Sequence, residues 1–357
     1  MSNWNWTKSF QRASPWPVID LLDDQTMTHL VMTHLHFEAI ANDPVVLRRY
    51  WAGNYLRGAL GQILLRTTCS EYGWRSTPPP PEHTANCPAC WLLTHRLDPG
   101  HARRAYSLVP PLPPVERVEP GQRFHFTLTL YGESWQFLPY FVLAVGQMGY
   151  EGVGVGRGRF TVRSITARNP LRQREEVILA PGEDLVKVPE LAVTWGDALR
   201  PAAPPSAAAV TLHFLTPTRL IDDQRLAKAP DFAPFFRRLL RRLDDLRVQF
   251  AAELPRDLAQ VARLHQAADE VQRVEAAIHW IEMIPRSGRD GREKPLSGFV
   301  GWVAYRATDW EPLWPYLQLG QALQVGKNVT KGNGVYQIAP LAVGPAYWQA
   351  DAFSHSA

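Results

Sequence analysis

Apolar and polar side chains alternate in residues 28–40, and a two-residue period is that of a β-strand. One side of this predicted strand is apolar and is expected to face the core. The other side carries the titratable residues His34, His36 and Glu38. Residues 45–65 follow with apolar positions at helical spacing, although glycines weaken this predicted helix and favour close packing or a break near Gly53.

The same two patterns recur in the residues that follow. Residues 124–131 predict a strand, residues 135–148 an apolar helix and residues 160–165 another strand, with a basic glycine loop at residues 149–159. Taken in order, this half is close to a β-α-β-β-α-β arrangement, the ferredoxin-like pattern. A proline-rich segment that contains cysteines, about residues 68–105, is expected to be an insertion in it.

The second half repeats the unit of helix, glycine loop and strand. Its predicted elements are strands at 210–214, 278–283, 299–305 and 335–338, helices at 232–253, 257–277 and 309–323, and a glycine loop at 326–334. A repeated unit of this kind predicts two similar domains in tandem. The alanine- and proline-rich residues 201–206 mark the boundary, which gives domains of residues 1–200 and 207–357. The predicted fold class is therefore α+β, with tandem ferredoxin-like (RRM-like) domains.

Composition narrows the class of protein further. A chain of 357 residues that is 45% hydrophobic can bury the cores of two domains. The net charge of +4 permits an anionic partner without requiring one. No basic leader with an apolar core is found, and no apolar run is long enough to cross a bilayer, so we expect a cytoplasmic protein without membrane contact.

The glycine loop at residues 326–334 suits an anion. Glycine lacks a Cβ, so backbone N–H groups can line a concavity, and Lys327 and Lys331 add charge. The loop leads from a helix into a strand and lacks both G-x-x-x-x-G-K-[ST] and G-x-G-x-x-G, which argues against a nucleotide site. A phosphate-binding loop and a plain glycine turn are the two interpretations.

Several blocks in this order resemble one family. The blocks are residues 55–61, 212–220, 298–301, 313–323 and 325–334. They are similar to blocks of the CRISPR repeat-processing endoribonucleases of the RAMP superfamily, and the resemblance extends over about residues 27–338. It implies two ferredoxin-like domains that bind repeat RNA and cut the precursor transcript. The implied reaction is metal-independent attack by a ribose 2′-hydroxyl, which leaves a 2′,3′-cyclic phosphate.

RNA contact is expected from basic loops and from the glycine loop, since RNA phosphates attract such groups largely without regard to sequence. The loop before residues 298–301 resembles a segment that holds repeat RNA in the family. The expected RNA-binding residues are Arg57, Arg157, Arg159, Arg286, Ser287, Arg289, Gly326, Lys327, Asn328, Lys331, Gly332 and Gly334. The arginines of residues 232–253 have acidic neighbours in the same helix, so a salt-bridged solvent face is the favoured interpretation there.

The catalytic residues are harder to assign. Relatives often carry a histidine in the first long helix, and this chain has Gln62 at that position, which cannot shuttle a proton at neutral pH. Our substitute for the acid or base is His36, with His34 second, because histidine suits proton transfer near neutrality. Tyr55 is a further candidate, for orienting the phosphate. Buried or solvated strand histidines remain the plain alternative.

The three cysteines are too few for a disulfide framework, and two of them have metal-ligand spacing. Cys87 and Cys90 form a C-x-x-C pair, with Cys69 upstream. A structural zinc site would need a fourth ligand, for which His95 is preferred over His83 and His101. Three reduced thiols without a metal are the alternative.

Three functions are compatible with these observations. The first is the repeat-processing endoribonuclease, with precursor CRISPR RNA as partner and no catalytic cofactor. The second is a non-cleaving repeat-RNA-binding subunit of a CRISPR effector complex, which Gln62 supports. The third is a zinc-stabilised scaffold that binds other proteins.

Overall fold

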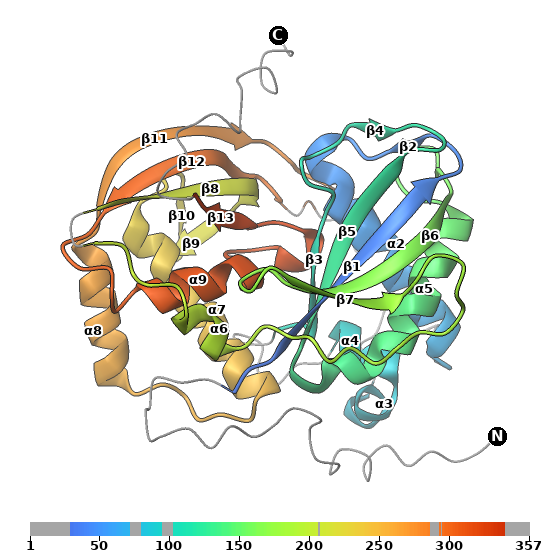
Figure 1. The fold of residues 1–357 in the computed structure, drawn as a ribbon, viewed down its shortest axis with the longest axis horizontal. Helices are drawn as coiled ribbons and strands as arrows, with labels where there is room; N and C mark the ends of the chain where they lie inside the picture. Colours follow the sequence, from blue (N-terminus) through green and yellow to red (C-terminus); the bar gives the residue numbers. More distant parts are fainter. Residues whose placement is uncertain are drawn as a thin grey trace.

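The computed structural model describes residues 29–71, 80–94, 103–205, 208–285, 293 and 295–339, which form two antiparallel sheets with helices packed on them (Figure 1). The first sheet has the strand order β3-β5-β1-β6-β7. Its strands are β1 (Met32–Ala41), β3 (Tyr106–Val109), β5 (Arg123–Tyr131), β6 (Phe160–Asn169) and β7 (Arg174–Leu179). Helices α2 (Ala52–Thr68) and α5 (Leu138–Glu151) cover one face of this sheet.

The alternation in β1 explains which face the helices cover. Leu35 and Phe37 are fully buried in one apolar cluster with Leu56 of α2 and Phe141 of α5. Since successive strand residues point to opposite sides, His34 and His36 lie on the face away from these helices. The uncovered face of the first sheet is therefore the one with the polar side chains.

The second sheet has the order β11-β12-β8-β13. Its strands are β8 (Ala209–Thr218), β11 (Gln272–Ile281), β12 (Gly298–Arg306) and β13 (Tyr336–Ile338). The accompanying helices are α7 (Phe232–Phe250), α8 (Leu258–Asp269) and α9 (Trp314–Leu323). A second apolar cluster joins Phe214 of β8 to Phe235 of α7 and Leu317 of α9.

The two sheets share one topology. In each, the first strand of its half lies in the middle, β1 between β5 and β6, and β8 between β12 and β13. The predicted tandem ferredoxin-like fold is confirmed. The smaller elements are β2 (Val45–Val46), β4 (Arg117–Val118), β9 (Leu220–Asp222), β10 (Arg225–Ala227), α3 (Pro81–Asn86), α4 (Pro88–Thr94), α6 (Trp195–Leu199), η1 (Arg49–Trp51), η3 (Gly132–Phe137) and η4 (Val329–Lys331). Within the described residues, every helix is too short or too polar to cross a membrane.

Two predicted elements were wrong at their ends. The helix expected at 257–277 stops at Asp269, because residues 272–281 pair with β12 as an edge strand whose side chains are largely exposed. The helix expected at 45–65 begins only at Ala52, after β2 and a 3-10 turn. Strand pairing decides both cases, and local sequence carries little trace of it.

The two halves meet where the C-terminal glycine loop packs against the first half. A Cβ on Gly53, at the start of α2, would lie 2.0 Å from the carbonyl oxygen of Lys331. The side-chain amide of the buried residue Gln324 donates to the carbonyls of Leu108 in β3, at 3.0 Å, and of Asn333, at 3.1 Å. The close approach of Gly53 to Lys331 and the hydrogen bonds of Gln324 together fix the glycine loop to the first half.

We expect Gly53→Ala and Gly58→Ala, two substitutions on the same helix, to have opposite effects. Gly53→Ala forces the glycine loop away from α2 and should lower the melting temperature by several degrees, at a cost of about 1–3 kcal/mol for overpacking. Gly58 has open space at its Cβ position, so Gly58→Ala should raise stability by up to about 1 kcal/mol. Thermal unfolding of both variants is the measurement, and equal effects would contradict the close approach.

Candidate functional site

A pocket of about 830 Å³ lies between the two halves. The first sheet contributes residues of β1, β5 and β6, and the second half contributes α9 and β13. Its polar lining is His34, His36, His125, Thr127, Arg168, Gln318, Gln321 and Gln337. Three imidazoles and a guanidinium thus gather in one cleft between the domains.

His34 is the buried histidine of this pocket. His34 is only 6% exposed. Its Nδ1 lies 3.2 Å from the hydroxyl of Thr129, the residue paired with it on β5. Burial disfavours the imidazolium and lowers the pKa of His34 to about 4. Its Nε2 has no hydrogen-bond partner among the described residues. His34 therefore offers a neutral ring with one unused nitrogen.

His36 lies two residues further along β1 and is only half-buried. Its Nδ1 is 3.2 Å from the hydroxyl of Thr127. Burial, followed by the charge of Arg168 and then that of His125, lowers the pKa of His36 to about 3. At neutral pH this imidazole is therefore neutral.

His125 was missed in the sequence analysis. It is exposed on β5, and its ring centroid lies 5.1 Å from that of His36. The alternation within residues 124–131 puts it on the polar side of a strand that was predicted. What the sequence could not supply was the register that pairs β5 with β1.

The pocket does not include three residues of α2 that were considered in the sequence, Tyr55, Arg57 and Gln62. None of them lines the pocket, because all three lie on α2, which packs on the opposite face of the sheet. The ring of Tyr55 stacks on Trp51 at 6.4 Å, and Gln62 is exposed to solvent.

The C-terminal glycine loop uses its backbone differently from the expectation. The amides of Lys327, Lys331, Gly332 and Gly334 donate to the protein's own carbonyl oxygens, so the idea that they face an anion was wrong. Gly326, Gly332 and Gly334 have φ values of 87°, 85° and 77°, and a Cβ on each would lie within 2.7 Å of a neighbouring atom. These glycines are required for packing. A ligand of this loop would therefore be contacted by its side chains and not by these backbone amides. The side-chain amide of Asn328 donates a hydrogen bond to the carbonyl oxygen of Pro295.

The other predicted RNA-binding residues have mixed surroundings. Arg159 forms an ion pair with Asp43 at 2.6 Å, while Arg157 is 71% exposed and lies 3.6 Å from Glu151. Arg57 is half-buried, and its Nε has no hydrogen-bond partner among the described residues. The expected residues Arg286, Ser287 and Arg289 lie outside the described residues.

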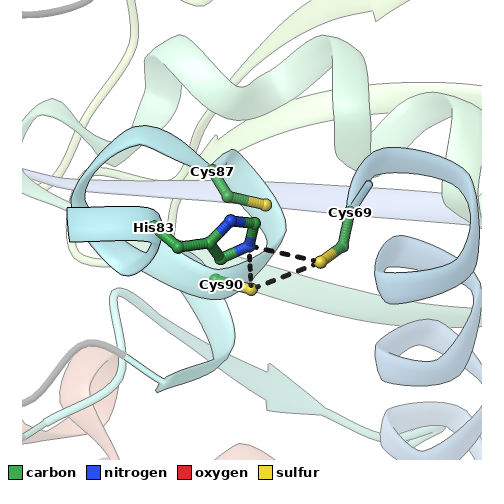
Figure 2. Close-up of side chains that lie close together, drawn as sticks. All are labelled: Cys69, His83, Cys87 and Cys90. Carbon is green, nitrogen blue, oxygen red and sulfur yellow. Dashed lines mark hydrogen bonds between the residues drawn. The ribbon is translucent and has the colours of Figure 1, made fainter. Parts of the chain in front are cut away.

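Three cysteines and one histidine form a compact cluster away from the pocket (Figure 2). Cys69 ends α2, His83 lies on α3, Cys87 follows α3, and Cys90 lies on α4. The four ligand atoms lie within 4.8 Å of one another. His83, one of the alternatives, supplies the imidazole here, and the preferred His95 lies outside the described residues. The cluster could hold a metal ion.

The distances fit tetrahedral coordination. The sulfurs of Cys69 and Cys90 are 3.6 Å apart, and His83 Nε2 is 3.4 Å from each of them. Tetrahedral zinc with its usual bond lengths places its ligand atoms about 3.5–3.8 Å apart. Glu71 lies 3.4 Å from His83 Nδ1, on the other side of the ring, and such a carboxylate orients a ligating imidazole.

Two family models match this chain. Residues 30–191 match the AF_1859 N-terminal domain, and residues 212–336 match the CRISPR-associated endoribonuclease Cas6. No curated protein sequence matches. Over residues 212–336, the Cas6 model confirms the resemblance to CRISPR-associated endoribonucleases.

Solved structures with this fold include several Cas6 proteins. Thermus thermophilus Cas6 is 15% identical with a TM-score of 0.52, over 87% of this chain and 99% of that one. A Cas6 product complex is 17% identical with the same TM-score, over 87% and 99% of the two chains. A partial Cas6-RT-Cas1–Cas2 complex is 13% identical with a TM-score of 0.52, over 87% of this chain and 46% of that one. At such identities the likeness is one of fold.

His34 should make the stability of the protein depend on pH. Because its pKa drops from 6.5 to about 4 on folding, the unfolded chain binds a proton here at a higher pH than the native state does. The contribution of the neutral His34 ring to the free energy of unfolding is therefore present above about pH 6.5, and it is lost as the pH falls toward 4. From pH 7 to pH 5 this costs about 2 kcal/mol.

His34→Asn keeps an acceptor for Thr129 but cannot titrate, so it should lose about 2 kcal/mol less stability than the native protein over this interval. Urea unfolding at pH 7 and pH 5 provides the comparison. Equal losses in the two proteins would show that His34 is not buried as a neutral ring.

Proposed function

We propose that this Cas6-type chain is an endoribonuclease that binds CRISPR repeat RNA and cuts the precursor transcript into guide units. The observation that carries the proposal is the pocket between two ferredoxin-like halves, which gathers His34, His36, His125 and Arg168. The match of residues 212–336 to the Cas6 family supports the substrate class. A cleft between domains that is open to solvent also suits an RNA strand.

The proposed chemistry is attack of a ribose 2′-oxygen on the adjacent phosphorus. The O2′–P bond forms, the P–O5′ bond breaks, and the proton from the 2′-hydroxyl is balanced by one given to the leaving 5′-oxygen. The products are a 2′,3′-cyclic phosphate and a 5′-hydroxyl. The reaction needs a base, an acid and positive charge near the phosphate, and no metal ion.

The pocket offers a group for each need. His36 is neutral at neutral pH and is assigned as the base, and a bound phosphate would raise its pKa toward the working range. His125, whose ring lies 5.1 Å away, is assigned as the acid. Arg168 lines the same pocket and supplies charge. With Nδ1 accepting from Thr129, His34 would carry its proton on Nε2 and donate it to a phosphate oxygen.

We also propose that the cluster of Cys69, His83, Cys87 and Cys90 holds a structural zinc ion. Burial raises the pKa of the Cys90 thiol, and the neighbouring Cys87 adds to the effect, so without a cation the thiolates are disfavoured. Zinc would supply that charge and tie α3 and α4 to the end of α2. Its role is structural, since the cluster shares no residue with the pocket.

Substitution of the pocket histidines should separate cleavage from folding. We expect His36→Ala and His125→Ala each to slow single-turnover cleavage of repeat RNA by about 10²–10⁴-fold, the usual contribution of a general acid or base. His213→Ala is the matched control, because His213 lies on β8, the equivalent strand of the second sheet, and does not line the pocket. Native rates for both pocket variants would refute the assignment. Tight binding without cleavage by the native protein would instead indicate the non-cleaving subunit.

The zinc proposal predicts one zinc ion per chain in protein purified without chelators. Cys90→Ser should lose the metal and melt at a lower temperature, because structural zinc contributes to folding. Glu71→Gln should weaken zinc binding about tenfold or more, whereas Glu82→Gln, on α3 beside His83, should not. Mass-spectrometric metal analysis and competition with a chromogenic chelator give both numbers. Well under one zinc ion per chain, with three titratable thiols, would exclude the site.

A further inference from the structure

The arginines of α7 fall into two groups, which the sequence did not distinguish. Arg237 pairs with Asp222 and Asp269, both at 2.7 Å, and Arg247 pairs with Asp244 and Glu253. Arg242 is buried and donates to the hydroxyl of Tyr131 and to the carbonyl of Leu323. Arg238 and Arg241 have no ion pair among the described residues. The expected salt-bridged solvent face therefore describes only part of this helix.

Arg238 and Arg241 line a second cavity, of about 1020 Å³, beside the C-terminal glycine loop. Lys327 of that loop lines the same cavity. Four aspartates also face it, but Asp222 is paired with Arg237, Asp244 with Arg256, and Asp245 with Arg103 at 2.5 Å. Asp223 is the remaining acid. Three cations are thus left to face the cavity with one unpaired carboxylate among the described residues.

These cations repel one another in the protein alone. Burial, then the charges of Arg238, Arg103 and Arg241, lower the pKa of Lys327. Burial and then the charge of Arg241 lower the pKa of Arg238 as well, against smaller opposing effects of Asp222 and Asp245. Like charges held together at a fold's surface destabilise it unless an anion occupies the space between them.

We propose that Arg238 and Arg241 of α7, together with Lys327, form a binding site for backbone phosphates of the repeat RNA. This proposal rests on the proposed function. The site is distinct from the catalytic pocket, with which it shares no lining residue. A groove of this volume with three side-chain cations suits the evenly spaced charges of an RNA strand, and it positions the RNA without reading its bases.

The test is a salt titration of binding, with fluorescently labelled repeat RNA and the full-length protein. Arg238→Gln/Arg241→Gln should weaken binding by about one to two decades at 0.1 M KCl. It should also reduce the slope of log K against log[KCl] by about 1.4–1.8, the loss of two phosphate contacts. Arg306→Gln removes one exposed charge from β12, outside the cavity, and it should leave the slope unchanged. Lys327→Gln changes an exposed loop residue and should reduce the slope by about 0.7–0.9. This single variant replaces the double variant in the test if the double variant does not fold.

The outcomes separate this inference from the proposed function. An unchanged slope in a folded double variant or in Lys327→Gln overturns the phosphate site and leaves the nuclease proposal standing. Failure of the native protein to bind repeat RNA overturns both. Release of the RNA by 10 mM inorganic phosphate at constant ionic strength would show a site for free phosphate in place of an RNA backbone.

Discussion

The packing of the C-terminal glycine loop against the first half is the constraint on which the rest of the structure depends. Gly53 of α2 touches the backbone of Lys331 so closely that no Cβ fits, and a Cβ on Gly332 would lie 2.7 Å from Pro110. The amide of Gln324 bridges β3 and the loop in the same place. Because the loop connects α9 to β13, this contact places both of those elements against the uncovered face of the first sheet. The pocket between the halves follows from it.

The same constraint separates three kinds of chemistry in space. Histidines gather inside the pocket, where burial keeps His34 and His36 neutral. Cations that form no ion pair with the described residues gather at the outer side of the glycine loop, on α7 and at Lys327. The cysteines lie at the far end of α2, where a metal ion would tie the short helices α3 and α4 to that end. The proposed function uses the first group for reaction, the second for holding RNA and the third for folding.

The sequence predicted what depends on local period and missed what depends on pairing between distant segments. Alternation in β1 was enough to place His34 and His36 on a polar face, and the repeated glycine loops were enough to predict the tandem fold. The partnership of His36 with His125 required the register between β1 and β5. The contribution of His83 to the cysteine cluster depended on how α3 turns back on α2, which spacing alone left open. The loop amides were misjudged because local sequence does not show that Arg219 and Pro217 lie within their reach.

Cleavage of repeat RNA by its own 2′-hydroxyl can be tested in a single experiment. The purified protein is incubated with end-labelled repeat RNA in magnesium-free buffer with excess EDTA, beside the same RNA carrying a single 2′-deoxyribose at the cut, while circular dichroism verifies that the protein stays folded. We expect the first RNA to be cut, leaving a 2′,3′-cyclic phosphate, and the second to survive. Cleavage of both RNAs, or cleavage only after a divalent metal is added, would contradict it.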